Sequence, residues 1–360
     1  MNNGHTHQDG VREYRGLRHR KLWLILLMTA MTACVFIFSL WYCNTDLTLS
    51  QVLGNIFSDD GTWEGYVVHD INLKRSVAAI IAGVGLGIAG AAMQSVLRNP
   101  LGSPYTLGLS NAAAFGASLG ILVMGGGMIA GSATSSYIID NPFIVTISAF
   151  AFSMVATFAI AAAMRFMNAS PETMILAGMA MSAIFSAGIA FLQYMADDMA
   201  LSAMVFWQFG DLEKISWANM PMMFIAVLLP TIYLYYKSWD LNAIDMGDDV
   251  AQGLGINVSF TRIAVLIASA VMTSVVVSFV GIIGFIGLLA PHLARKVVDN
   301  DKKLLFPMSA VIGAFVMLSA MMIAEYAFSF TIPVGIVTSL VGGPLFLWIL
   351  FSKHRAGRSA

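Results

Sequence analysis

The chain has 360 residues, of which 58% are hydrophobic and only 11% are charged, and its mean hydropathy is +0.78. Soluble proteins carry about 25% charged residues, so this composition excludes a water-soluble domain and a disordered chain. Nineteen basic and twenty acidic residues leave a net charge of −1, which excludes a nucleic-acid-binding protein. The class that remains is a protein that crosses a lipid bilayer several times.

Long stretches almost without charge identify the membrane spans. A helix needs about 17 to 25 apolar residues to cross the hydrocarbon core of a bilayer. Nine stretches of this kind cover residues 22–43, 76–97, 104–125, 142–164, 173–196, 217–236, 263–291, 304–324 and 332–351. None alternates with a period of two, as the strands of an outer-membrane barrel do, so the predicted fold class is all-α.

The seventh stretch, 263–291, is too long for one span and short for two. Positive charge decides between these alternatives, because Lys and Arg gather in cytoplasmic loops. A break near Gly281, Gly284 and Gly287 places sixteen basic residues on the cytoplasmic side and three on the outer side. An unbroken helix would move seven of the sixteen to the outer side. We therefore predict ten transmembrane helices with both termini in the cytoplasm.

This topology divides the chain into a basic N-terminal arm (1–21), a ten-helix domain (22–352) and a short tail (353–360), the arm and the tail both being cytoplasmic. The largest cytoplasmic segment between helices is 237–262. All charged residues fall in loops or near helix ends, so no carboxylate is expected near the bilayer centre. Ion-coupled transporters usually carry such carboxylates, and their absence from the predicted spans disfavours ion coupling.

One sequence pattern could suggest a nucleotide site but has a simpler structural interpretation. Residues 85–90 fit G-x-G-x-x-G, yet they lie inside an apolar helix and not after a strand. Ala79, Gly83 and Gly87 recur every four residues, which predicts a smooth face for close helix packing. The sequence contains no P-loop pattern and no cluster of catalytic or metal-ligand residues. We expect no catalytic residue, no metal and no cofactor in this chain.

Three segments near predicted helix ends carry more specific sequence patterns than the G-x-G-x-x-G stretch. The first contains Arg-Asn-Pro-Leu at 98–101, where proline halts a helix and the arginine can meet headgroups or a partner. The second, 284–295, is a glycine-rich helix that closes on a proline and a basic residue at the inner surface. The third joins Pro-Val-Gly at 333–335 to Gly-Gly-Pro at 342–344. The expected residues at the cytoplasmic face are Arg98, Asn99, Pro100, Pro291, His292 and Arg295.

Taken in this order, the three segments resemble the FecCD family of ABC-transporter permeases, whose members import vitamin B12, haem and ferric siderophores. The resemblance runs from about residue 70 to 352, and R-N-P-L and G-F-I-G-L-x-x-P-H-x-x-R are its most distinctive parts. It implies a ten-helix permease domain in the cell membrane, in agreement with the count from charge. It also implies a homodimer or paired permease, two P-loop ATPase subunits that use ATP, and an extracytoplasmic substrate-binding protein.

The resemblance gives the 237–262 segment a role as a coupling loop. In ABC importers a short helix with an E-A-A-x-x-x-G pattern inserts into a groove of the ATPase subunit. Residues 249–255 match this spacing, with aspartate for glutamate and valine for the first alanine. A short helix with a small face suits a groove, and the final glycine lets the chain turn out of it. The expected coupling residues are Asp249, Ala251, Gly253 and Gly255.

The outer segments depart from the family pattern. The family usually has R-L-P-R where this chain has Asn-Leu-Lys-Arg at 72–75, and Thr-Ile at 331–332 replaces the usual Glu-Leu. Fewer arginines therefore remain to hold glutamates of the binding protein. We expect docking to use Lys74, Arg75 and Lys214, or basic groups of the binding protein that meet Asp59, Asp60, Asp211 or Glu213.

By the same resemblance, the fifth span and the segment 201–212 line and gate the translocation path. Ser182, Ser186 and Gly188 are the candidate residues there. The preferred cargo is a ferric siderophore, ahead of vitamin B12 or haem, and an oxyanion such as molybdate is a further alternative. Two rival functions are a stand-alone secondary transporter and a structural or receptor-like membrane protein.

Overall fold

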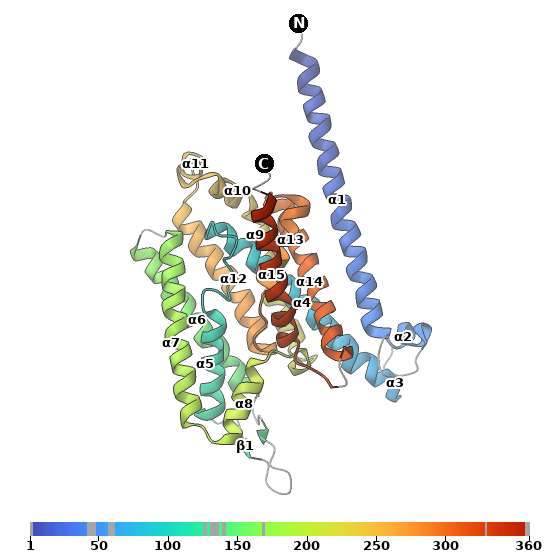
Figure 1. The fold of residues 1–360 in the computed structure, drawn as a ribbon, viewed down its shortest axis with the longest axis vertical. Coiled ribbons are helices and arrows are strands. Elements are labelled where there is room, and N and C mark those ends of the chain that lie inside the picture. Colours follow the sequence, from blue (N-terminus) through green and yellow to red (C-terminus); the bar gives the residue numbers. More distant parts are fainter. Residues whose placement is uncertain are drawn as a thin grey trace.

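The computed structural model describes residues 3–41, 48–56, 62–124, 128–129, 137–138, 142–167, 170–327 and 330–356. Figure 1 shows a bundle of helices with one long helix, α1, beside it. Within the described ranges, strands are limited to β1 (Met128–Ile129) and β2 (Tyr137–Ile138), which pair antiparallel. The fold class is all-α, as the sequence predicts.

Ten helices follow the predicted spans in chain order, with the seventh stretch divided. They are α1 (Asn3–Trp41), α4 (Lys74–Val96), α5 (Leu109–Leu122), α6 (Pro142–Phe166), α7 (Pro171–Met195), α9 (Met220–Tyr236), α12 (Val258–Val280), α13 (Ile286–Val298), α14 (Lys302–Tyr326) and α15 (Val334–Ala356). Six described helices are long and apolar enough to cross a membrane, or seven if the bent pair α9–α10 is one span. The helices α5 and α13, of 14 and 13 residues, extend only about 20 Å. Ten crossings therefore stay a prediction.

Shorter helices lie at the two ends of the bundle. They are α2 (Leu49–Asn55), α3 (Trp63–Tyr66), the π-helix η1 (Val67–Leu73), α8 (Asp198–Gln208), the 3-10 helix η2 (Leu212–Lys214), α10 (Ser238–Met246) and α11 (Asp248–Gly253). Figure 1 places α10 and α11 at the same end as the start of α1 and the end of α15, and α2, α3 and α8 at the opposite end. We call these the α11 end and the α8 end. The α11 end corresponds to the predicted cytoplasmic face, and residues 357–360 of the tail lie outside the described residues.

The long stretch 263–291 is broken, as the charge distribution predicts. The helix α12 ends at Val280, Gly281 takes a φ of +80°, and α13 begins at Ile286. The 284–295 segment was expected to close on Pro291 and Arg295; α13 continues through Pro291 and ends at Val298, with Arg295 in its last turn. Proline removes the N–H that would bond to the carbonyl of residue 287. The carbonyl of Gly287 lies directly against Gly90 of α4. Because Gly90 has no side chain, α13 can continue past the proline at this close contact.

Glycines on α4 allow its backbone to lie against the backbones of α13 and α14. A Cβ atom on Gly83 would overlap the carbonyl of Gly313 in α14. A Cβ atom on Gly90 would overlap the carbonyl of Gly287 in α13. This confirms the interpretation of the G-x-G-x-x-G pattern as a helix-packing surface. As a result α4 is mostly buried in the bundle, whereas α1 and α7 are mostly exposed.

Candidate functional site

The predicted coupling loop forms two short helices, α10 and α11, separated by Gly247. At the end of α11 the N–H of Ile256 donates to the carbonyl of Ala251 (3.0 Å), and the N–H of Gly255 donates to that of Gln252 (2.9 Å). This pair of bonds is a glycine C-cap, and Gly255 has the positive φ (+81°) that such a cap requires. The expectation that this glycine turns the chain out of the helix is confirmed.

The predicted coupling residues do not all share one face of α11. Asp249, Gly253 and Gly255 are exposed, whereas Ala251 is fully buried and packs in a small cluster beside Ile256. The small residue thus contacts the rest of this chain and does not form the outward face. The role of these four residues in coupling to an ATPase stays a prediction.

The outward side of the coupling loop is apolar. Val250 on α11 and Leu254, the residue that follows this helix, are 46% and 68% exposed, and Met246 at the end of α10 is 75% exposed. Residues with this spacing lie on one side of a helix. We call Met246, Val250 and Leu254 the α11 ridge. It adjoins a shallow groove on the protein surface that is also lined by Trp239.

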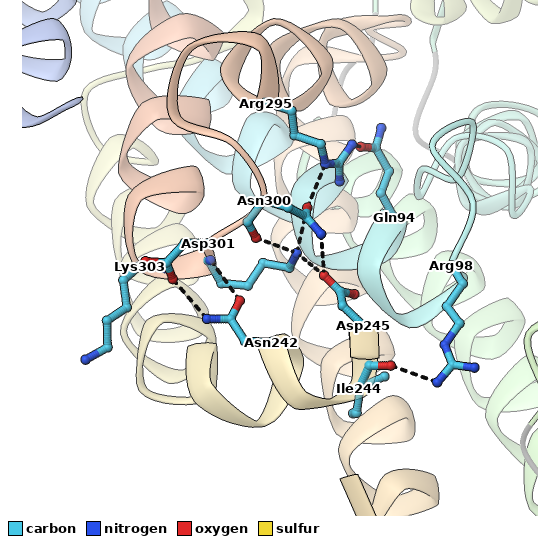
Figure 2. A network of polar contacts seen from close by, with 10 residues as sticks. Gln94, Arg98, Asn242, Ile244, Asp245, Arg295, Asn300, Asp301 and Lys303 are labelled. Atoms are coloured by element: carbon cyan, nitrogen blue, oxygen red, sulfur yellow. Dashed lines mark hydrogen bonds and ion pairs between the residues drawn. The ribbon is translucent and has the colours of Figure 1, made fainter. Parts of the chain in front are cut away.

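Asp248, the neighbour of the predicted Asp249, ties α11 to the membrane helices. Its two carboxylate oxygens accept hydrogen bonds from Arg262 of α12, at 2.9 and 3.0 Å. Arg98 at the end of α4 donates to the same carboxylate and to the carbonyl oxygen of Ile244 in α10 (2.7 Å; Figure 2). The Arg262 side chain is only 3% exposed. We call Asp248, Arg98 and Arg262 the aspartate clamp.

The Arg-Asn-Pro segment places Arg98 for this contact. Arg98 follows the last turn of α4 with a φ of +46°, a left-handed conformation that costs about 1 kcal/mol for a residue with a Cβ. The N–H of Asn99 donates to the carbonyl of Gln94 (3.2 Å), and its side-chain oxygen accepts from the N–H of Leu101 (2.9 Å). These bonds and Pro100 end α4 at the α11 end, as the sequence predicts.

A second polar network holds α10 against the start of α14 (Figure 2). Lys302 has a fully buried side chain that forms an ion pair with Asp245 and donates to the carbonyl and side-chain oxygens of Asn300 (3.0 and 2.9 Å). Asn242 donates to Asp301 (2.9 Å) and accepts from the backbone N–H of Lys302 (3.0 Å). A buried ammonium is tolerated only with such partners. The network therefore fixes α10 to α14.

The α13 motif joins the same network. Arg295 donates to the side-chain oxygen of Asn300 at 3.0 Å and to that of Gln94 in α4 (Figure 2). His292 lies edge-on to Phe346 of α15, with ring centroids 6.2 Å apart. The motif residues at the predicted cytoplasmic face thus join α4, α13 and α15 within the chain.

Two of the predicted docking residues, Lys74 and Arg75, lie at the α8 end, where α4 begins. Arg75 forms an ion pair with Glu213 and donates to Glu325 at 3.0 Å, and its side chain is 17% exposed. Lys74, the first residue of α4, is partly exposed. Arg75 is therefore engaged within the chain. The docking role of both residues stays a prediction, and the acidic alternatives Asp59 and Asp60 lie outside the described residues.

Lys214, the third docking residue, covers the end of α8. Its ammonium donates to the carbonyl oxygens of Phe206 (3.2 Å) and Trp207 (3.1 Å). A cation is favourable at a helix C-terminus, where unpaired carbonyls gather. Desolvation lowers the pKa of Lys214 to about 8, although the nearby Asp211 acts in the opposite direction.

The predicted path residues on α7 face α5. Asn111 of α5 donates to the hydroxyls of Ser182 (2.6 Å) and Ser186 (3.1 Å). A Cβ atom on Gly188 would lie 2.7 Å from the ring of Phe115, also on α5. These three residues therefore form part of the α5–α7 contact. Their role in a translocation path stays a prediction.

Comparison with known proteins decides the family. The FecCD transport family matches residues 30–352, which is most of the chain. The chain belongs to the FecCD family. It is 40% identical over 334 residues to MJ0087 of Methanocaldococcus jannaschii, which is named provisionally as an ABC transporter permease protein (92% of this chain, 94% of that protein). It is 33% identical over 316 residues to the hemin transport system permease protein HmuU of Yersinia pestis (87% and 91%).

A solved structure supports the same assignment. It is an inward-facing conformation of an ABC transporter assigned provisionally to the metal-chelate type, with a TM-score of 0.79 and 26% sequence identity. The match covers 91% of this chain and 99% of that chain. As a FecCD permease the chain is a multi-pass membrane protein, of a family that acts with ATPase and binding-protein partners. Permeases of this family have no ATPase site of their own.

Proposed function

We propose that the chain is the transmembrane subunit of an importer for metal chelates, with a ferric siderophore as the preferred cargo. The family match over residues 30–352 carries this proposal. Relatives at 30–33% identity are named for hemin, Fe(3+)-citrate and vitamin B12, each a metal ion held by an organic ligand. A relative at 30% identity is named for molybdate, so an oxyanion is the alternative cargo.

We further propose that two copies of the chain pair and that the path runs along their interface. The outward face of α7 supports this arrangement. It carries Leu176, Met179 and Ile184, which are 66%, 59% and 61% exposed, together with small alanines. Bulky side chains beside small ones suit close packing against a second helix bundle in a membrane.

The α11 ridge is the proposed contact with the ATPase subunit. An apolar helix face that inserts into a hydrophobic groove is a common mode of recognition. Val250 and Leu254 would enter the groove, and the exposed Asp249 beside them would meet a basic residue at its rim. The chain then performs no covalent chemistry. ATP closes the two ATPase subunits, the coupling loop follows, and access to the path alternates between the two sides of the membrane.

Co-purification with the ATPase subunit tests the ridge. Leu254→Asp places a charge in the proposed apolar contact, so the ATPase should be lost from the purified complex. Leu254→Met keeps an apolar side chain of similar volume and should retain it. If both variants retain a full complement of ATPase, the ridge is not the contact.

Uptake into proteoliposomes tests the cargo. Vesicles that contain the permease, its ATPase and its binding protein are offered an iron siderophore, hemin, vitamin B12 and molybdate in parallel. We expect ATP-dependent accumulation of the iron siderophore at a lower cargo concentration than is needed for hemin, vitamin B12 or molybdate. Accumulation of molybdate without any of the chelates would show that the cargo class is wrong.

A further inference from the structure

The aspartate clamp joins three parts of the chain at one carboxylate. Arg98 precedes Asp248 by 150 residues and Arg262 follows it by 14, yet both guanidinium groups bond to this side chain. Arg98 lies two residues beyond the end of α4, and Arg262 lies near the start of α12. Charge-assisted bonds of this kind are stronger and more directional than neutral ones.

Among the described contacts, the clamp is a polar connection between the outward α11 and the buried centre of the bundle. An apolar contact adds to it, through the small cluster that contains Ala251. The helix α4 is the most buried of the candidate spans, and its glycine face contacts α13 and α14. A displacement of α11 that acts on Arg98 therefore acts on the helix that holds the bundle together.

The two arginines converge on the carboxylate of Asp248. Arg98 takes a left-handed backbone conformation, and with it the side chain also bonds to Ile244 at the end of α10. Arg262 is almost fully buried and uses two nitrogen atoms on the two oxygens of the carboxylate. A bidentate pair fixes orientation as well as distance, which transmits rotation of α11 as well as translation.

We propose that Asp248 is the positioning residue through which the movement of α11 reaches α4 and α12. This inference rests on the proposed function as an ATP-driven permease. Asp248 lies behind the ridge and holds it, while the ridge itself binds the ATPase. Neutralising Asp248 should therefore leave the ATPase bound but disconnect its cycle from the membrane helices.

The test measures the number of ATP molecules hydrolysed per cargo molecule imported, in proteoliposomes that hold the complete transporter. Asp248→Asn keeps the size of the side chain and removes its charge. We expect a normal amount of ATPase in the complex and a rise in this ratio of at least about tenfold, the scale of losing a charge-assisted hydrogen bond. A merely structural role would lower both rates together and leave the ratio unchanged, which would overturn the proposal.

The matched control is Asp299→Asn, the same change in another ion pair at the α11 end, with Lys21 of α1. The side chain of Asp299 is 77% exposed, and exposed ion pairs contribute little, so the ratio should stay at its original value. If Asp248→Asn does not assemble, Arg98→Gln is measured instead, since it leaves Arg262 on Asp248. An unchanged ratio in that variant also overturns the proposal. Failure of the unaltered complex to import with ATP would contradict the proposed function itself and not the clamp.

Discussion

The closest approach of α4 to α13 gives a sharp prediction for Gly90. A Cβ atom at this position would lie 2.7 Å from the Cα and 2.6 Å from the carbonyl carbon of Gly287, where ordinary contacts are 3.4–4 Å. Backbone atoms cannot turn aside, so Gly90→Ala must push the two helices apart. Alanine gains about 1 kcal/mol in helix propensity, but overpacking a buried contact costs about 3 kcal/mol. We expect a net loss of about 2 kcal/mol in the free energy of unfolding.

Gly85→Ala on the same helix is the matched control. Its closest neighbour is a side-chain methyl group of Val227 at 2.9 Å, which can move by a change of rotamer. Thermal unfolding of both variants is followed in the same detergent by the loss of the monodisperse peak in size-exclusion chromatography. Gly90→Ala should lower the midpoint by about 4 °C or more, and Gly85→Ala should stay near the original value. Equal midpoints for the two variants would refute the packing argument.

Three further predictions concern the two ends of the bundle. Asp245→Asn leaves the buried Lys302 without its carboxylate and should cost about 3 kcal/mol in thermal stability. The double variant Asp245→Leu with Lys302→Met should recover most of this loss. Unchanged stability of Asp245→Asn would contradict the prediction. Lys214 should become reactive to amine reagents, measured by mass spectrometry, as the pH rises through about 8, because desolvation favours its neutral form; reaction only above the ordinary lysine pKa of 10.5 would contradict it. Gly255→Ala, at a φ of +81°, should cost about 1 kcal/mol, and Gly253→Ala, in equally open space, should cost nothing; equal effects would show that backbone strain is not the reason.

The helix pattern follows from the sequence where one physical rule dominates. Hydropathy located the spans, since a stretch of about 20 apolar residues has few alternatives to a buried or lipid-facing helix. The break in the stretch 263–291 followed from the positions of Lys and Arg, and it occurs at Gly281 as expected. Helix α13 continues through Pro291, and the carbonyl of residue 287 that lacks the proline N–H lies against a glycine of α4. That contact joins Gly90 and Gly287, which are far apart in the sequence, so it has no local signal.

The polar site at the α11 end was predicted only in part. The sequence offers Asp248 and Asp249 side by side, and the family spacing favours Asp249. In the structure, Arg98 and Arg262 both pair with Asp248. The fold brings these arginines to α11, and the sequence spacing does not show this. Lys302 is one of the sixteen basic residues predicted to lie on the cytoplasmic side. It is fully buried because α10 and the turn before α14 supply its partners.

The α8 end shows the same limit. Arg75 was predicted to face a partner, but Glu213 and Glu325 approach it from η2 and α14. The π-helix at 67–73 just before it had no signal in the sequence, since such helices form where packing forces an extra residue into a turn.

ATP-driven uptake is the most direct test of the central claim that this chain is a conduit powered by separate subunits. Proteoliposomes enclose ATP and contain the permease with its ATPase, and the loaded binding protein is supplied outside with a radiolabelled iron siderophore. The account predicts that the label accumulates with ATP and stays outside when a non-hydrolysable analogue replaces it or when the ATPase is omitted. Accumulation by the chain alone, driven by an ion gradient, would contradict the account.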